Sequence, residues 1–199
     1  MRVTNGHLVH PRRGLALWLG VMIFGIAGCA GLERQTFDLA GDPARAGRVR
    51  ALRQAGALIV RTPEAVAPTA SDRVVVRAAD GSLAVLPDAQ WSDQLPNLLR
   101  HRLIDALQIA GVAAGDSGAG QLALLTDIRR FEIDATQNVA RAEIAARLVD
   151  TASGGVRAAE AFVVETPAPE HYGAPAIAAL ATAAGQASSR IANWARARL

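Results

Sequence analysis

Cys29 is the most informative chemical group in the sequence, because it is the only cysteine among 199 residues. A single thiol has no partner for an intramolecular disulfide, which leaves a buried side chain, a nucleophile or a site of covalent modification. Ile26-Ala27-Gly28 precedes it, so two small residues stand directly before the thiol. Small residues at that place suit the pocket of a processing peptidase, and this favours covalent modification.

The segment before Cys29 has the parts of a secretory signal, namely a basic start, a short apolar run and small residues at the processing position. Three arginines precede the apolar run Leu15 to Ile26, which is too short to cross a bilayer because a spanning helix takes about 20 apolar residues. Ile26-Ala27-Gly28-Cys29 resembles the lipobox of bacterial lipoproteins, whose cysteine is diacylated on sulfur. We predict a cleaved signal peptide over 1–28 and lipidation of Cys29. The alternative is an ordinary signal peptide followed by a buried free cysteine.

Beyond Cys29 the sequence offers little for catalysis. The remaining histidines, His101 and His171, lack a second histidine or a cysteine at the spacing of a metal site. No serine lies in a Gly-x-Ser-x-Gly elbow, and the absence of lysine excludes a Walker-type ATP site and a Schiff base. We therefore assign no catalytic, metal-binding or cofactor-binding residue, and we expect a protein that is not an enzyme.

The charge balance does not point to a nucleic-acid partner. All 21 basic residues are arginines, and three of them fall in the predicted signal, so the processed chain carries as many arginines as acidic residues. The sequence pI of about 10.3 reflects a few arginines that keep their protons at any accessible pH. Aromatic residues are few, and no basic stripe is placed to follow a phosphate backbone.

Residues 29–56 are predicted to form a lipidated lead-in to one domain at 57–199. After a short alternating segment at 36–39, the lead-in becomes polar and contains four arginines, which are Arg45, Arg48, Arg50 and Arg53. Near a lipid anchor these arginines can contact anionic headgroups, at about 1 kcal/mol each. A solvated linker is the alternative.

Three short β-prone runs open the domain, at 58–60, 73–77 and 83–86. Asp80-Gly81 is the turn signal of a hairpin with a loop of about five residues between the second and third runs. A helix follows up to Gly111, with Ser92 or Asp93 expected as its N-cap and a proline inside its first turn.

The second half predicts a meander and a final helix. Runs at 122–133, 140–148 and 156–165 alternate in hydropathy, and the first changes phase near Arg129 and Arg130, which indicates a bulge. The last helix starts near Ala174, and its alanines and Gly185 are expected to let it approach the sheet closely. The order β-β-β-α-β-β-β-α predicts an α+β fold, a two-layer sandwich with a mostly antiparallel sheet and two main helices.

Two tryptophans of the predicted domain have two interpretations each. An exposed tryptophan can anchor a partner protein, whereas a packed one stabilises the core. Trp91 stands just ahead of the first helix, where an apolar residue commonly packs back onto the helix, and Trp194 falls on the apolar face of the last helix. We expect both to be packed.

Several segments together resemble a known family. They are LAVLPDAQWSDQLPNLLRHRLIDALQIAG, LLTDIRRFEID and AEIAARLVDTASGGVRAAEAFVVETP, which follow the lipobox and precede an alanine-rich C-terminal helix. This arrangement is similar to the ABC-type transport auxiliary lipoproteins, the paraquat-inducible-type lipoproteins that accompany MCE-domain lipid transporters. The most specific pieces are Trp91, Arg130-Phe131 and Leu148-Val149-Asp150, none of them catalytic.

The resemblance implies a docking or structural subunit at the outer-membrane end of a system that moves phospholipid between membranes. Its implied partners are an MCE-domain protein, the inner leaflet of the outer membrane and further copies of the chain in a homo-oligomer. Ala30 is not the aspartate that resembles an inner-membrane retention signal, so the expected location is the periplasmic face of the outer membrane. The alternative function is an outer-membrane lipoprotein that activates cell-wall synthesis or assists lipopolysaccharide assembly.

Overall fold

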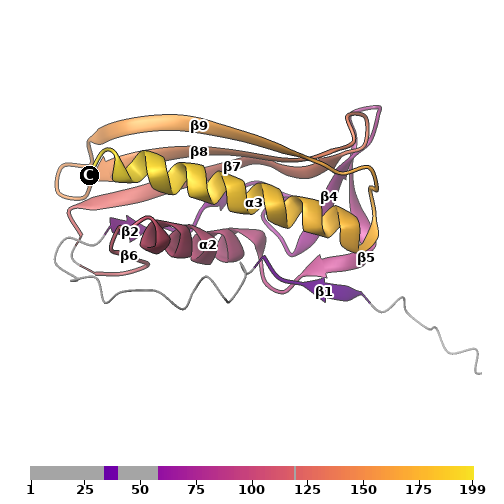
Figure 1. Ribbon diagram of the computed structural model, residues 1–199, viewed down its shortest axis with the longest axis horizontal. Coiled ribbons are helices and arrows are strands. Elements are labelled where there is room, and N and C mark those ends of the chain that lie inside the picture. Colours follow the sequence, from indigo (N-terminus) through magenta and orange to yellow (C-terminus); the bar gives the residue numbers. More distant parts are fainter. Residues whose placement is uncertain (1–33, 40–57, 119) are drawn as a thin grey trace, which may run out of the picture. The chain divides into compact units, whose positions relative to one another are not determined.

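The fold has two layers, and Figure 1 shows both helices on the same face of one sheet. The structure, a computed structural model, describes residues 34–39, 58–118 and 120–199. Its helices are α2 (Leu95–Ile109) and α3 (Gly173–Arg196). Its strands are β1 (Gln35–Phe37), β2 (Leu58–Val60), β3 (Glu64–Ala65), β4 (Arg73–Arg77), β5 (Leu83–Trp91), β6 (Ala114–Gly115), β7 (Leu122–Asp134), β8 (Val139–Asp150) and β9 (Val156–Pro167). The predicted α+β sandwich is confirmed.

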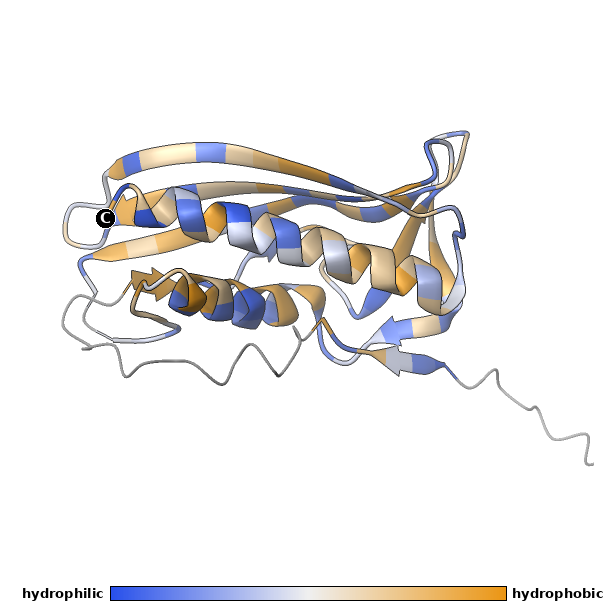
Figure 2. Cartoon of the chain, viewed as in Figure 1, coloured by the Kyte–Doolittle hydropathy of each residue, from blue (hydrophilic) through white to orange (hydrophobic). Residues whose placement is uncertain are grey.

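The predicted meander forms the main part of the sheet. Strands β7, β8 and β9 pair antiparallel, with Ile144 opposite both Ile128 and Phe162. The register of β7 shifts between Ile128 and Arg130, which confirms the predicted bulge. Alternate side chains of β8 are buried beneath the helices, and these are Ala140, Ala142, Ile144, Ala146 and Leu148. Figure 2 shows the matching alternation of hydrophobic and hydrophilic residues along these strands.

The other edge of β7 is occupied by strands whose direction the sequence did not reveal. β2, β3 and β4 follow one another along β7, and each pairs with it in parallel. Parallel pairing requires a crossover, and α2 lies within the connection that carries the chain from β4 to β7. The two-residue strands β3 and β6 were not predicted, because two residues are too few to show a period.

The N-cap of helix α2 lies one residue after Asp93 and two residues after Ser92, the two predicted caps. Gln94 holds the N-cap position and makes no side-chain cap hydrogen bond. The Asp93 carboxylate instead accepts from the main-chain N–H of Gln94 (2.6 Å) and from Asn97 Nδ2 (3.1 Å). The prediction of Ser92 or Asp93 as the cap is therefore wrong, whereas the proline in the first turn is confirmed.

The predicted stop of α2 is confirmed in detail. Gly111 has a φ of +83°, a conformation that a residue with a Cβ rarely adopts. The Val112 N–H donates to Leu107 O (2.9 Å) and the Gly111 N–H donates to Gln108 O (3.0 Å), which is the Schellman pattern. The hairpin loop of five residues at 78–82 is confirmed as well, with Gly81 at a φ of +83°.

Helix α3 packs as its pattern predicts, with one exception. Its apolar face is buried through Ile177, Leu180, Ala184 and Ile191. Gly185, however, faces α2 rather than the sheet. A Cβ atom on this residue would lie 2.5 Å from Arg102 Nη2 of α2. The expectation that Gly185 lets the helix approach the sheet is therefore wrong.

Candidate functional site

The two histidines take separate places in the fold. His101 is exposed on α2, whereas His171 precedes α3, where its Nε2 lies 2.7 Å from Asn138 Oδ1. Within residues 34–39, 58–118 and 120–199, no group of three or more His, Cys, Asp or Glu side chains is arranged to hold a metal ion. Neither of the two helices in these described residues is long and apolar enough to cross a membrane.

Both tryptophans of the domain are core residues. Trp91 is 2% exposed, and its ring centroid lies 6.0 Å from that of Phe131. Trp194 is 6% exposed and meets Phe162 edge-on at 5.8 Å. The packing interpretation is confirmed for both, so neither is an exposed anchor for a partner.

Cys29 and the four arginines of the lead-in lie outside the described residues. Within the predicted lead-in, residues 35–37 form strand β1 of the sheet. β1 pairs in parallel with β5, with Phe37 opposite Trp91. Further bonds fix the segment, since the Ser92 N–H donates to Phe37 O (2.7 Å) and Arg34 Nε donates to Pro87 O (3.1 Å). The chain is thus held firmly a few residues after Cys29.

A clamp on Leu39 completes this attachment. Leu39 is 1% exposed, and its carbonyl oxygen accepts a hydrogen bond from the half-buried guanidinium of Arg102 on α2. Desolvation lowers the pKa of Arg102, while the carboxylates of Asp105 and Asp38 act in the opposite direction. The absence of a side chain at Gly185 leaves room for this guanidinium between α2 and α3.

Sequence reasoning missed this clamp. Arg102 stands beside His101 in a run of charged residues, which usually marks a solvated face. The available signal was its helical position directly before the buried Leu103, together with a glycine in the middle of an alanine-rich helix. A glycine within a helix destabilises it by about 1 kcal/mol relative to alanine, so its presence there calls for a close contact.

Three loops meet at one end of the sheet, which we call the hairpin end. They are the β4–β5 loop (78–82), the β7–β8 loop (135–138) and the segment before α3 (168–172). The Ala135 N–H donates to Arg77 O (3.0 Å), and the bond between His171 and Asn138 joins the other two loops. β1 starts on this side, because it runs parallel to β5 and away from the 78–82 loop (Figure 1).

Several charged side chains at the hairpin end are held by ion pairs or by main-chain groups. Arg77 binds Glu132 through two hydrogen bonds of 2.7 and 3.0 Å, and only 3% of the Glu132 side chain is exposed. This hydrogen bonding raises the pKa of Arg77. Arg141 Nη2 lies 2.5 Å from Glu165 Oε1, and Asp134 Oδ1 accepts two main-chain N–H groups of the β7–β8 loop at 3.0 Å each.

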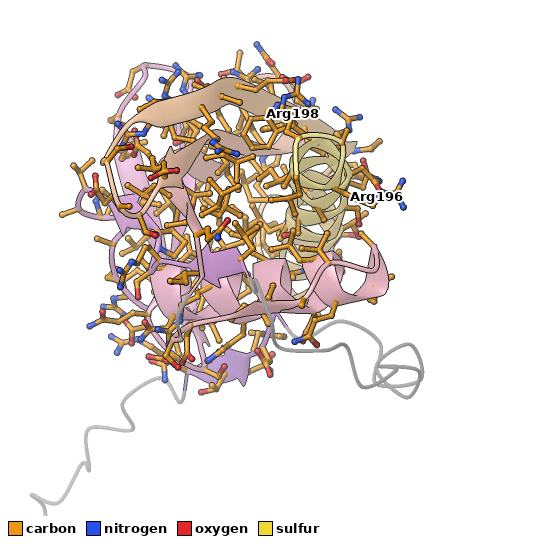
Figure 3. All side chains as sticks on the ribbon, turned by 90° about the vertical axis from the view of Figure 1, so that its left-hand side faces the viewer. Arg196 and Arg198 are labelled. Carbon is orange, nitrogen blue, oxygen red and sulfur yellow. The ribbon has the colours of Figure 1, made fainter. Side chains whose placement is uncertain are left out.

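The opposite end, which we call the helix end, contains the C-termini of both helices. Arg196 Nη1 donates to Ala110 O at the end of α2 (3.4 Å), and Arg198 Nη1 donates to Trp194 O in α3 (3.1 Å). Arg198 also lies over the Trp194 ring and 3.5 Å from Glu160 of β9. Figure 3 views this end and shows both arginines beside the last turn of α3. Large apolar side chains are exposed here as well, namely Ile109, Val156 and Leu199.

The outer face of the meander, away from the helices, has a shallow hollow. Ala145, Ala159 and Ala161 line it together with charged residues of both signs, among them Asp127 and Arg147. Small residues leave space there, but the mixed charges do not select a ligand of one sign. The hollow is open to solvent and contains no group of catalytic residues.

The pattern of the family described as "ABC-type transport auxiliary lipoprotein component" matches residues 37–192, from β1 to the last turns of α3. The chain belongs to this family. The match covers the core tryptophan Trp91, the bulged strand β7 and the clamp formed by Arg102 and Gly185. The family therefore describes the whole two-layer domain rather than a short motif, and it confirms the resemblance seen in the sequence.

Several proteins are similar to this chain in sequence or in fold. An uncharacterized protein of Bradyrhizobium diazoefficiens is 32% identical over 144 residues, which are 69% of this chain. The chain spans only 38% of the length of that relative. A crystal structure of a Xanthomonas campestris protein is 28% identical, with a TM-score of 0.64 over 70% of this chain and 83% of that one. A second, uncharacterized protein of known structure shares the fold at 18% identity, with a TM-score of 0.65 over 81% of this chain and 97% of its own.

Proposed function

We propose that this chain is an outer-membrane-anchored auxiliary lipoprotein of an ABC/MCE-type transport system that moves phospholipid between membranes. It acts as a docking subunit and performs no catalysis itself. The observation that carries the proposal is membership of the transport auxiliary lipoprotein family over residues 37–192. The contacts of several charged groups of the described residues are structural, since Arg77 and Glu132 form an ion pair and Asp134 binds main-chain N–H groups of a loop.

Anchoring is assigned to Cys29, with residues 1–28 removed as a lipoprotein signal peptide and residues 29–56 as the start of the processed chain. Each buried methylene contributes about 0.8 kcal/mol, and a single myristoyl chain binds membranes only reversibly. The two or three chains of a bacterial lipoprotein therefore hold the domain stably. Ala30, which follows the cysteine, supports sorting to the periplasmic face of the outer membrane.

The partner of this subunit is an MCE-domain protein, and ATP hydrolysis takes place in another subunit because the chain has no lysine for a Walker site. The helix end offers a docking surface, since it exposes Ile109, Val156 and Leu199 beside arginines. Further copies of the chain are a second class of partner, as a homo-oligomer.

Cys29→Ala tests the anchor. We expect this variant to fold normally and to appear in the soluble periplasm, whereas the unaltered protein fractionates with the outer membrane. Intact mass of the processed protein provides a direct check, because diacylation adds the mass of two acyl chains and a glycerol to Cys29. A bare thiol at Cys29, or a Cys29→Ala variant that still fractionates with the outer membrane, would contradict the anchor.

Co-purification tests the partner. An MCE-domain protein is expected to copurify with the membrane-extracted lipoprotein. Recovery of a cell-wall synthase or a lipopolysaccharide-assembly barrel protein in its place would favour the alternative function. A double His101→Ala, His171→Ala variant serves as the control, because these histidines have no catalytic role in the proposal and complementation of a deletion should be unaffected.

A further inference from the structure

The hairpin end exposes three large side chains with apolar surface. Leu83 is 44% exposed and Val85 is 37% exposed, both on the part of β5 that β1 does not cover. Tyr172, the only tyrosine of the chain, is 67% exposed at the N-cap of α3. Single exposed apolar residues are ordinary, but these three share the end of the sheet from which β1 starts.

Chain length keeps Cys29 near this end. Arg34 is five positions after Cys29 in the sequence, so their Cα atoms are at most about 18 Å apart. Along β5, the residue level with Arg34 in the register of β1 is Asp88, and Leu83 lies five residues further toward the hairpin loop, about 17 Å away. The Cα atom of Cys29 can therefore lie level with the free part of β5.

The helix end is out of reach of the same bilayer unless the domain lies flat. Helix α3 has 24 residues and runs from the hairpin end to the helix end, a length of about 36 Å. This is about twice the reach of the five-residue connection. The two ends are therefore not equivalent with respect to the anchor.

We propose that the hairpin end rests on the bilayer surface in which Cys29 is anchored, with Leu83, Val85 and Tyr172 at the level of the lipid headgroups. This inference depends on the lipidation of Cys29 in the proposed function. Tyrosine suits that level, since its ring is apolar and its hydroxyl is polar. The helix end then points away from the membrane, where a partner protein can reach it.

The charges of the hairpin end indicate which headgroups it meets. Arg77 is bound to Glu132, and the loops add the carboxylates of Asp80 and Glu170. Asp80 is itself held by the Ser82 hydroxyl and N–H (2.6 and 2.9 Å). The surface is therefore not basic, and it fits a leaflet rich in zwitterionic phosphatidylethanolamine better than a strongly anionic one.

The test uses the full lipidated chain in vesicles of phosphatidylethanolamine with a minor fraction of phosphatidylglycerol. Because Cys29 is acylated, a cysteine introduced elsewhere is the only thiol available to an environment-sensitive dye. Leu83→Cys and Val85→Cys carry the dye at the hairpin end. Val156→Cys is the matched control, because Val156 is also a strand residue, is 58% exposed and lies at the helix end.

We expect headgroup-labelled quencher lipids to quench the dye at residues 83 and 85 severalfold more strongly than at residue 156. Flotation of the same vesicles reports the anchor separately, and circular dichroism confirms that each variant is folded. Flotation with equal quenching at both ends, or with stronger quenching at residue 156, would overturn the orientation and leave the anchor intact. Loss of flotation in the parent protein would overturn the anchor and the orientation together.

Replacing most phosphatidylethanolamine by phosphatidylglycerol sharpens the result. Quenching at residue 83 is then expected to stay the same or to fall, because the hairpin end is not basic. A severalfold rise on the anionic vesicles would contradict the proposed contact with zwitterionic headgroups.

Discussion

At the hairpin end a nearly buried carboxylate, Glu132, binds Arg77, whereas at the helix end exposed arginines bind main-chain carbonyl groups as well as an exposed carboxylate. Arg77 on β4 and Glu132 on β7 form an ion pair that joins these neighbouring strands. Arg196 and Arg198 instead bind carbonyl oxygens near the ends of α2 and α3. The comparison shows that similar residue types stabilise the two ends for different physical reasons.

The parallel arrangement of the helices explains the arginines at the helix end. Because α2 and α3 both end there, the negative ends of two helix dipoles lie side by side (Figure 1). Cations offset this partial charge, typically by about 0.3–1 kcal/mol each at exposed positions. The hairpin end has the start of only α3, and its charges are free to form ion pairs.

The largest effect on this comparison is expected from the aromatic core at the helix end. Trp194→Ala removes the ring that packs edge-on against Phe162 and lies beneath Arg198, and should lower the free energy of unfolding by about 3–5 kcal/mol. Ile109→Ala at the same end should change it by less than about 0.5 kcal/mol, because Ile109 is 63% exposed. Denaturant unfolding of both variants measures the difference. Equal losses would show that Ile109 is buried by an unrecognised contact.

Removing one carboxylate charge at each end compares how much the ion pairs of the two ends stabilise the fold. Glu132→Gln breaks the buried two-bond contact with Arg77 and should cost about 2 kcal/mol of unfolding free energy. Glu160→Gln weakens an exposed ion pair at 3.5 Å and should cost less than about 0.5 kcal/mol. Urea titration at two salt concentrations is the measurement. A larger loss from Glu160→Gln would contradict the assignment of the stronger ion pair to the hairpin end.

Gly185→Ala probes the connection between β1 and the helices. Alanine favours the helix by about 1 kcal/mol, but its Cβ displaces Arg102 from Leu39 O, a charge-assisted bond of about 1.5–3 kcal/mol. The net result should be a loss of about 1 kcal/mol, with faster hydrogen exchange at residues 37–39. Ser189→Ala on the exposed face of α3 is the control and should leave exchange at β1 unchanged. A more stable Gly185→Ala variant with slow exchange at β1 would show that Arg102 does not clamp Leu39.

The smallest effects are expected from acidification of two turns. The pKa of Asp80 is lowered by a hydrogen bond from the Ser82 hydroxyl, and that of Asp150 by the Ser153 N–H, from an ordinary value of 3.8. A lowered pKa stabilises the folded state above the unfolded value, and the contribution is lost as the pH falls through the folded value. Both turns should therefore loosen only below the ordinary value of 3.8.

Carboxyl NMR titration of both residues measures these values, and Asp80→Asn should remove the pH response of the hairpin loop alone. An Asp80 that titrates above its ordinary value would show that Ser82 does not hold its carboxylate in solution.

Much of the architecture was predictable, because the spacing of apolar residues along the chain shows which side chains are buried. The alternation of β8, the phase change at Arg130, the stop at Gly111 and the packing of both tryptophans each follow from a local rule of spacing or backbone conformation. The N-cap was misplaced, since Asp93 and Gln94 are neighbours and only the backbone geometry shows which of them the helix follows. Cys29 was recognised from its flanking residues and remains a prediction.

The sequence alone determined the two-layer class, the meander and the absence of a lysine-based active site, because these depend on residue type and local spacing. Tertiary structure alone decided that β2, β3 and β4 run parallel to β7, that Arg102 reaches Leu39 past Gly185, and that both helices end at the same side. The physical reason is that alternation assigns a side chain to a face but not to a partner. Partners 63 residues apart, such as Arg102 and Leu39, are chosen only when the whole core packs.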